Sequence, residues 1–466
     1  MKKRMWICVF VLMLALILVS LPVYAELKFK WGPYLRVRYD YYKNFMDLAN
    51  AVESANRDTR QYVRTKTSLW GQADFDKNTS LYAKLSNENR AHLYFEGTSS
   101  SFPDKQPSKK GYHYNINEVF FENLYLDLKD FMDMPVDLRI GKQDFIGQYG
   151  ENFLIADGTP VDGPRSVYFN AAKASWRVDD TNTVDVIYIN DPRTDQNLPV
   201  INRDKLLDYT TGYKKEGQYL TTTDEQGYVL YWKNKAIKDV GLEGYYIFKR
   251  ESEEGGAGVY STEKTKLSTL GSFIKYSFAP YALRAQLAGQ WGEYGENDRT
   301  GLGGYIYLDR DIKEIKTWSP AVTLGYIYLS GDDRKTDKQE GWDPLFSRYP
   351  WISDIYLYTI TRETGVVAYW TNLHGLRTII TLKPTAKSKI TLGYLYLRAV
   401  EAVPSTANAM FSGNSKDRGQ CPQVKFEYTF NKYTTVCFLA EYFIPGRFYA
   451  NGDPALLVRT ELQVKF

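Results

Sequence analysis

The C-terminal stretch Leu456 to Phe466 limits what the whole chain can fold into. Val458, Leu462 and Val464 alternate there with charged and amide side chains, so one face is apolar and the other polar. A period of two residues predicts a β-strand. A strand at the end of an open sheet leaves an exposed edge that invites aggregation, whereas a closed barrel pairs its last strand with its first. The pattern therefore favours a barrel over an open soluble sheet.

The N-terminal stretch indicates export from the cytoplasm. Basic residues at positions 2–4 precede an apolar run at 5–19, and the chain then reads Val-Tyr-Ala up to Ala25. Basic, apolar and small residues in this order are typical of a secretory signal peptide. We therefore expect a signal peptide over residues 1–25 and a mature chain, 26–466, that forms a single domain. An uncleaved membrane anchor is the alternative.

The net charge argues against one class of partner. Without the signal peptide the chain carries 56 Lys and Arg against 55 Asp and Glu. Domains that bind nucleic acid are usually strongly basic, so we expect no nucleic-acid partner. The mean hydropathy of −0.43 would suit a soluble protein. This inference does not hold for a membrane barrel, because every second residue of each strand faces the polar lumen.

Alternating segments recur along the chain. Residues 35–39, 60–69 and 283–291 all alternate apolar and polar side chains, and we expect about eighteen such strands. Aromatic residues make up 15% of the chain, which suits the aromatic girdles of membrane barrels. Cys421 and Cys437 fall on adjacent predicted strands but out of register, so we expect two free thiols.

The predicted connections alternate in length. Short turns lie at 76–78, 179–182, 279–281 and 431–432, and long loops at 97–114, 147–164, 191–224, 331–364 and 399–420. Outer-membrane barrels have short periplasmic turns and long extracellular loops. We therefore predict an all-β fold, a single transmembrane antiparallel β-barrel in the bacterial outer membrane. An even number of strands places both termini on the periplasmic side.

Two stretches resemble the alginate-export family of outer-membrane porins. The first comprises Leu138-Arg139-Ile140-Gly141-Lys142-Gln143, Tyr149-Gly150, Arg165 and Phe169. The second comprises Leu324-Gly325-Tyr326, Ser330-Gly331-Asp332-Asp333 and Asp343-Pro344-Leu345-Phe346. Lys142 stands where the family has Arg, and Asn170 stands where it has Asp. A weaker match lies at Leu270-Gly271 and Gln290-Trp291-Gly292.

The resemblance implies a barrel with an Arg-lined lumen that passes an anionic polysaccharide or oligosaccharide. Exporters of this family are pictured with loops plugging the lumen from both sides, whereas every predicted periplasmic turn here is short. This departure keeps two other functions open. One is a general porin for small anionic solutes such as sugar acids, and the other is a closed barrel with a structural or adhesive role.

Basic residues on the inward parity are the candidate lining of the solute path. A guanidinium binds a carboxylate as a bidentate fork and is weakly hydrated. The alternative is that a wet lumen needs polar side chains of any kind, since Arg facing lipid costs about 2–4 kcal/mol. Inward acids such as Asp137 and Glu461 should pair with some arginines. The candidates are Arg36, Arg38, Arg60, Arg64, Arg139, Lys142, Arg165, Arg284, Arg377, Arg398 and Arg459.

An enzyme is not expected. The histidines His92, His113 and His374 stand apart from any motif that would supply a nucleophile within hydrogen-bond reach. We find no metal-ligand spacing and no nucleotide motif, so we predict no cofactor, metal or catalytic residue. The expected partners are outer-membrane lipid, lipopolysaccharide and the anionic saccharide or small anions, and the export reading leaves room for periplasmic secretion proteins.

The loop from Gly331 to Thr364 is expected to shape the channel. It carries aromatic residues that disordered segments usually lack, including Trp342 and Trp351. These rings need a surface, and the barrel mouth is the nearest one. We therefore expect the loop to fold over or into the mouth, with Arg348 and Arg362 near the solute. Packing outward as a stiff cap is the alternative.

Overall fold

The structure is a computed structural model that describes residues 27–49, 59–95, 119–156, 169–193, 197–201, 223–252 and 264–466. The predicted signal peptide and Arg165 lie outside these residues. None of the described helices is long and apolar enough to span a membrane.

The described part of the chain contains nineteen β-strands. The first nine are β1 Lys28–Lys43, β2 Arg60–Asp74, β3 Thr79–Phe95, β4 Val119–Leu128, β5 Val136–Gln143, β6 Phe169–Arg177, β7 Asn182–Asp191, β8 Val200–Ile201 and β9 Glu225–Asn234. The others are β10 Val240–Glu251, β11 Thr265–Phe278, β12 Tyr281–Tyr294, β13 Asn297–Asp311, β14 Ala321–Leu329, β15 Leu373–Thr385, β16 Ser388–Arg398, β17 Asp417–Thr429, β18 Thr434–Pro445 and β19 Ala455–Lys465. The helical segments are η1 Phe131–Asp133, η2 Gly150–Asn152 and α3 Tyr356–Thr364.

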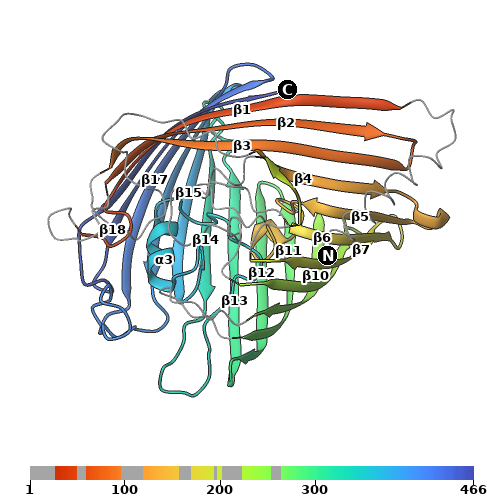
Figure 1. The fold of residues 1–466 in the computed structure, drawn as a ribbon. Helices are drawn as coiled ribbons and strands as arrows, with labels where there is room; N and C mark the ends of the chain where they lie inside the picture. Colours follow the sequence, from red (N-terminus) through yellow and green to blue (C-terminus); the bar gives the residue numbers. More distant parts are fainter. Residues whose placement is uncertain are drawn as a thin grey trace.

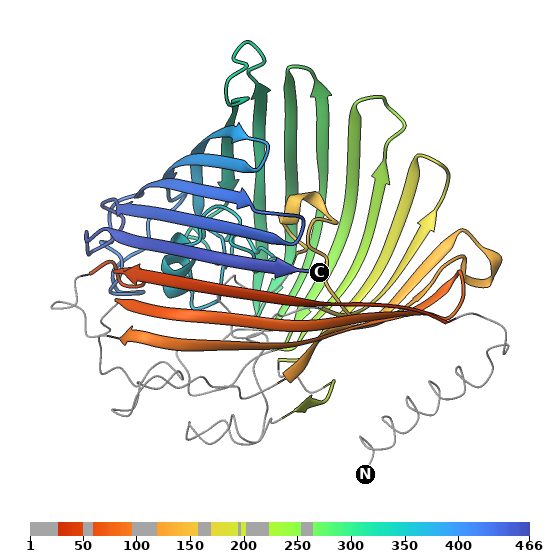
Figure 2. The same ribbon diagram turned by 90° about the horizontal axis from the view of Figure 1, so that it is seen from above.

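Eighteen of these strands form a closed antiparallel barrel, as predicted (Figure 1). Each strand pairs with the next along the chain, and β19 closes the ring by pairing with β1, as the view from above shows (Figure 2). The short β8 stands apart, because it pairs only with the start of β4. Closure leaves no free sheet edge for the C-terminal strand.

The two rims of the barrel differ as expected. Short turns form one rim, at 75–78, 129–135, 178–181, 235–239, 279–280, 312–320, 386–387 and 430–433. Both ends of the described chain lie at this rim, where the amide of Phe466 donates to the carbonyl of Pro33 at 3.2 Å. The long connections lie at the other rim, with one exception. Residues 295–296 join β12 to β13 there by a tight turn.

The outer face of the barrel is apolar. On β19, Leu462 is 39% exposed on the outside, whereas Arg459 on the opposite parity is 5% exposed. Outward aromatic residues gather near each rim, as membrane interfaces require. Those near the long loops are Tyr188, Tyr228, Tyr246, Trp291, Tyr326, Tyr394 and Tyr442, and those near the short turns are Trp176, Trp232, Tyr276, Phe278, Tyr433 and Phe466.

The barrel interior holds the buried core rather than an empty pore. The helix α3 lies inside the wall (Figure 1), where Tyr356 is fully buried and its ring lies 4.7 Å from that of Phe443 on β18. Two loops, residues 144–156 and 330–372, pack apolar groups against the inward side chains of the strands in this space. Cys421 and Cys437 are free thiols, as predicted.

Candidate functional site

An arginine ladder runs along the lumen side of β1, β2 and β19. The inward parity of β1 places Arg36 and Arg38 on one face, and the register with β2 and β19 brings Arg64 and Arg459 beside them. Carboxylates separate the guanidinium groups. The N–O contacts form one chain: Arg64–Glu88 3.3 Å, Glu88–Arg36 3.0 Å, Arg36–Glu461 3.8 Å, Glu461–Arg38 3.9 Å, Arg38–Asp40 2.8 Å, Asp40–Arg459 2.5 Å and Arg459–Asp354 2.7 Å.

Further cations extend the ladder. Lys66 and Lys84 share the single carboxylate of Glu122, at 2.7 and 3.1 Å. The guanidinium of Arg60 lies 5.2 Å from the centre of the Phe45 ring, a cation–π contact. Cations therefore outnumber carboxylates among these described groups.

Water reaches only part of the ladder. The side chains of Arg38 and Arg64 are 0 and 1% exposed, whereas those of Arg36 and Lys84 are 14 and 20% exposed. The more exposed cations are the ones that a solute in the lumen can contact without a change in the protein.

The loop 144–156 between β5 and β6 folds into the lumen and is held by polar contacts. The hydroxyl of Tyr149 donates to Asp185 at 2.9 Å, and the amide of Gly150 donates to Glu243 at 3.1 Å. Arg284 forms an ion pair with Glu151 at 2.8 Å. These partners lie on β7, β10 and β12, so the loop crosses a broad section of the wall.

The loop 330–372 between β14 and β15 also folds inward, which confirms the predicted direction. A buried charge cluster anchors its first half. The carboxylate of Asp343 lies 3.0 Å from Arg299 on β13 and 4.0 Å from Lys249 on β10. Arg348 pairs with Glu225 on β9 at 3.1 Å. Burial alone would raise the pKa of Asp343, but the surrounding cations outweigh it and lower that pKa to about 2.

The second half of this loop is anchored on the opposite strands. Glu363 of α3 accepts from Arg418 on β17 at 2.7 Å, and the hydroxyl of Thr359 donates to the carbonyl of Phe45 at 3.0 Å. Arg362 pairs with Asp47 at 2.8 Å. Like Arg348, Arg362 is therefore held by a carboxylate of the protein.

The two inward loops meet at a cluster of rings. Phe153 lies 5.3 Å from Trp342 and 5.1 Å from Trp351, measured between ring centres. Glycine makes room for this packing on the wall. A Cβ on Gly303 would lie 2.5 Å from the Trp342 ring, and one on Gly227 would lie 2.6 Å from the Phe346 ring. The cluster joins the loops into one internal plug.

Most of the predicted lining residues do face the lumen. Arg139 contacts Asp127 through two bonds of 2.6 and 2.8 Å, and Arg284 reaches both Glu151 and Asp309. Lys142 lies at the end of β5 and is 2% exposed. Among the predicted residues that the structure describes, the inward arginines are Arg36, Arg38, Arg60, Arg64, Arg139, Arg284, Arg377 and Arg459.

The prediction that Arg398 faces the lumen is wrong. It shares its parity with Leu392 and Tyr394, which are 41 and 43% exposed on the outer face, while Leu395 and Leu397 point inward and are fully buried. Arg398 is exposed at the end of β16, on the outside of the long-loop rim. Of the two acids expected to pair with lumen arginines, Glu461 does so. Asp137 instead pairs with Arg177 at the short-turn rim.

Several residues of the lumen network were not predicted from the sequence. The plug anchors Lys249, Arg299 and Arg418 and the carboxylates Glu122 and Glu225 stand on inward positions of their strands. Their parity places them in the lumen, but nothing in the sequence shows that inward loops will meet them.

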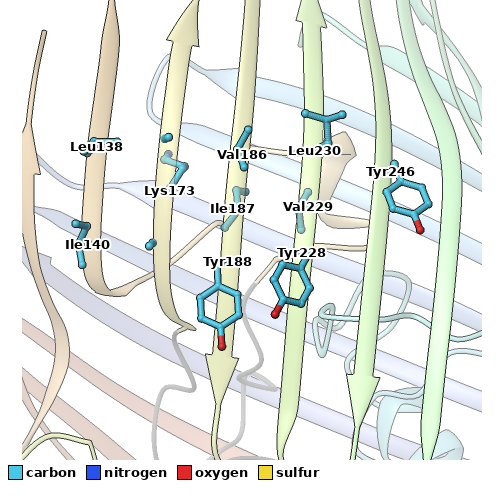
Figure 3. Close-up of a pocket in the computed structure, with 12 residues that line it drawn as sticks. Leu138, Ile140, Lys173, Val186, Ile187, Tyr188, Tyr228, Val229, Leu230 and Tyr246 are labelled. Carbon is cyan, nitrogen blue, oxygen red and sulfur yellow. The ribbon is translucent and has the colours of Figure 1, made fainter. Parts of the chain in front are cut away.

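The outer wall carries a groove that does not belong to the solute path (Figure 3). It runs across β5, β6, β7, β9 and β10, and its outward lining includes Ile140, Val186, Tyr188, Leu230 and Tyr246. These side chains are 38 to 54% exposed and apolar or aromatic. Such a surface fits lipid chains.

The described residues contain no group of three or more His, Cys, Asp or Glu side chains that could hold a metal ion. His374 lies on the outer face, with Nδ1 3.2 Å from the hydroxyl of Tyr326. His113 lies outside the described residues.

Solved structures with this fold are outer-membrane barrels. Acinetobacter baumannii OccAB4 is 12% identical with a TM-score of 0.54, and a BenF-like porin from Pseudomonas fluorescens Pf-5 is 9% identical with a TM-score of 0.53. Pseudomonas aeruginosa OccK2 (OpdF), solved in complex with glucuronate, is 11% identical with a TM-score of 0.52. Each alignment covers 94% of this chain and 98% of the other.

The sequence comparison identifies the family. No curated protein matches this chain. The alginate export family model, in contrast, matches residues 34–461, nearly the whole barrel. The fold, the outward aromatic belts and the short turns agree with an outer-membrane channel. The chain therefore belongs to the alginate export family and is a β-barrel of the bacterial outer membrane.

Proposed function

We propose that this channel passes anionic saccharides, as polymers or oligomers, along the arginine ladder. The observation that carries the proposal is the excess of cations over carboxylates on β1, β2, β3 and β19. A uronate carboxylate matches the bidentate geometry of a guanidinium. Membership of the alginate export family supports the same class of solute.

The alternation of charges along the ladder suits movement rather than capture. The guanidinium groups of Arg36, Arg38, Arg64 and Arg459 each contact a protein carboxylate, so a solute carboxylate exchanges one ionic contact for another. In a wet pore each contact is worth on the order of 1 kcal/mol. A row of weak, equivalent sites lets a chain of uronates enter and leave without a deep energy well.

The internal plug favours a second candidate, a porin for small anionic solutes such as sugar acids. The rings of Phe153, Trp342 and Trp351 pack together in the lumen, and a polymer needs this plug to move. A single uronate needs less space. OccK2, a barrel of the same fold, was solved in complex with glucuronate.

Uptake into proteoliposomes tests both candidates. Purified protein is reconstituted, and the entry of uronate oligomers is compared with that of neutral glucose oligomers of equal length and with free glucuronate. Faster entry of uronate oligomers supports saccharide transport, and entry of glucuronate alone supports the small-solute porin. Equal entry of charged and neutral sugars would contradict both.

A further inference from the structure

One arginine of the lumen differs from the others in its surroundings. Arg377 on β15 lines a pocket between residues 350–354 of the inward loop and the strands β15 to β18. Its Nη1 donates to the carbonyl of Trp351 at 3.3 Å. Arg36, Arg139 and Arg284 each form an ion pair with a carboxylate. No ion pair to Arg377 occurs among the described residues.

A tyrosine hydroxyl lies beside this guanidinium. The register of β13, β14 and β15 aligns Tyr307, Gly325 and Arg377 in one row. Gly325 lets the Tyr307 ring cross β14, because a Cβ there would lie only 2.0 Å from that ring. The Tyr307 hydroxyl and the Arg377 guanidinium are hydrogen-bonding neighbours, and the hydroxyl and the Arg377 Nε are both buried. The hydroxyl oxygen can accept from the guanidinium, which has only donors, and so hold it in place beside the pocket.

The carboxylates of the pocket are already engaged by other donors. Asp354 pairs with Arg459 at 2.7 Å. Glu441 accepts from the hydroxyl of Ser353 at 2.7 Å, the amide of Ile355 at 2.8 Å and the side chain of Gln423 at 2.8 Å. They hold the loop in place and leave the donors of Arg377 to an external anion.

We propose that this pocket is a binding subsite for the carboxylate of a uronate, with Arg377 as its donor and the Tyr307 hydroxyl holding that guanidinium in place. Thr391 and Gln423 line the same pocket and supply a hydroxyl and an amide oxygen that suit the hydroxyl groups of a sugar ring. The subsite rests on the proposed function, because it places one residue of the anionic solute at a fixed point in the lumen.

Block of ion current in planar bilayers tests the subsite. Sodium glucuronate is added to single channels of the wild type, Arg377→Gln and Arg398→Gln, and the concentration that halves the open current is measured. We expect Arg377→Gln to raise this concentration about tenfold, the loss of one charge-assisted contact. Arg398→Gln is the matched control, because Arg398 lies on the neighbouring strand but faces outward. Glucuronate should halve the current of this variant at the same concentration as in the wild type.

Two further variants protect the test against misfolding. Tyr307→Phe removes only a hydroxyl and should weaken the block in the same direction, whereas Arg377→Lys should restore part of it. If glucuronate blocks the wild type and both Arg377→Gln and Tyr307→Phe equally, the subsite is wrong while the channel function stands. If glucuronate neither blocks nor passes through the wild-type channel, the proposed function fails and the subsite fails with it.

Discussion

At the residue scale, parity places side chains correctly only where the two faces of a strand differ in polarity. On β19 they do, and Arg459 faces the lumen as predicted. The segment before Arg398 reads Leu-Gly-Tyr-Leu-Tyr-Leu, with bulky apolar groups on both parities. Leu395 and Leu397 point inward because the internal plug covers them. Without knowledge of that plug, nothing in the sequence indicates that Arg398 faces outward.

The ion pairs of Arg284 make a prediction at the same scale. This side chain joins the inward loop, through Glu151, to Asp309 on β13. Arg284→Gln should cost about 1–3 kcal/mol of loop docking, typical of a lost charge-assisted bond. We therefore expect more frequent open events in single-channel recordings, by about tenfold. Arg310→Gln, which breaks an exposed pair with Glu314, is the control and should leave the open events unchanged. The same gating in both variants would show that Arg284 does not hold the loop.

At the element scale, the two inward loops show what a sequence can and cannot reveal. The aromatic residues of loop 330–372 predict that it needs a surface, and it does pack inward. The inward fold of loop 144–156 was not predicted, because its anchors are polar and lie far away in the sequence. Asp185 and Glu243, for example, meet it only after the barrel has closed.

The ring cluster between these loops predicts a gain of conductance on truncation. Trp342 is 1% exposed and packs against Phe153 and the backbone of Gly303. Trp342→Ala should cost about 3–5 kcal/mol of packing, loosen both loops and raise single-channel conductance several-fold.

Trp318→Ala serves as the matched control, since Trp318 is 50% exposed in a short turn. It should leave conductance unchanged. If Trp342→Ala folds correctly and conducts like the wild type, the ring cluster does not restrict the channel.

At the scale of the whole molecule, the sequence predicted the architecture well. Period-two segments, alternating connections and an amphipathic last strand all require a closed barrel, and the structure has these features. The tight turn at 295–296 departs from the pattern, since it lies at the rim of the long loops. The plug could not be foreseen in full, because period-two alternation describes the wall and contains no information about what fills the lumen.

The most direct test of the account is the ion selectivity of the whole channel. The zero-current potential of the wild-type protein is measured in planar bilayers across a gradient of potassium chloride. The surplus of cations along the ladder predicts a channel that prefers chloride over potassium, and the sign of the zero-current potential shows this preference. Replacing Arg36, Lys84 and Arg377 together by Gln should move that potential toward zero. A wild-type channel that prefers potassium, or a potential unchanged in the triple variant, would contradict the account.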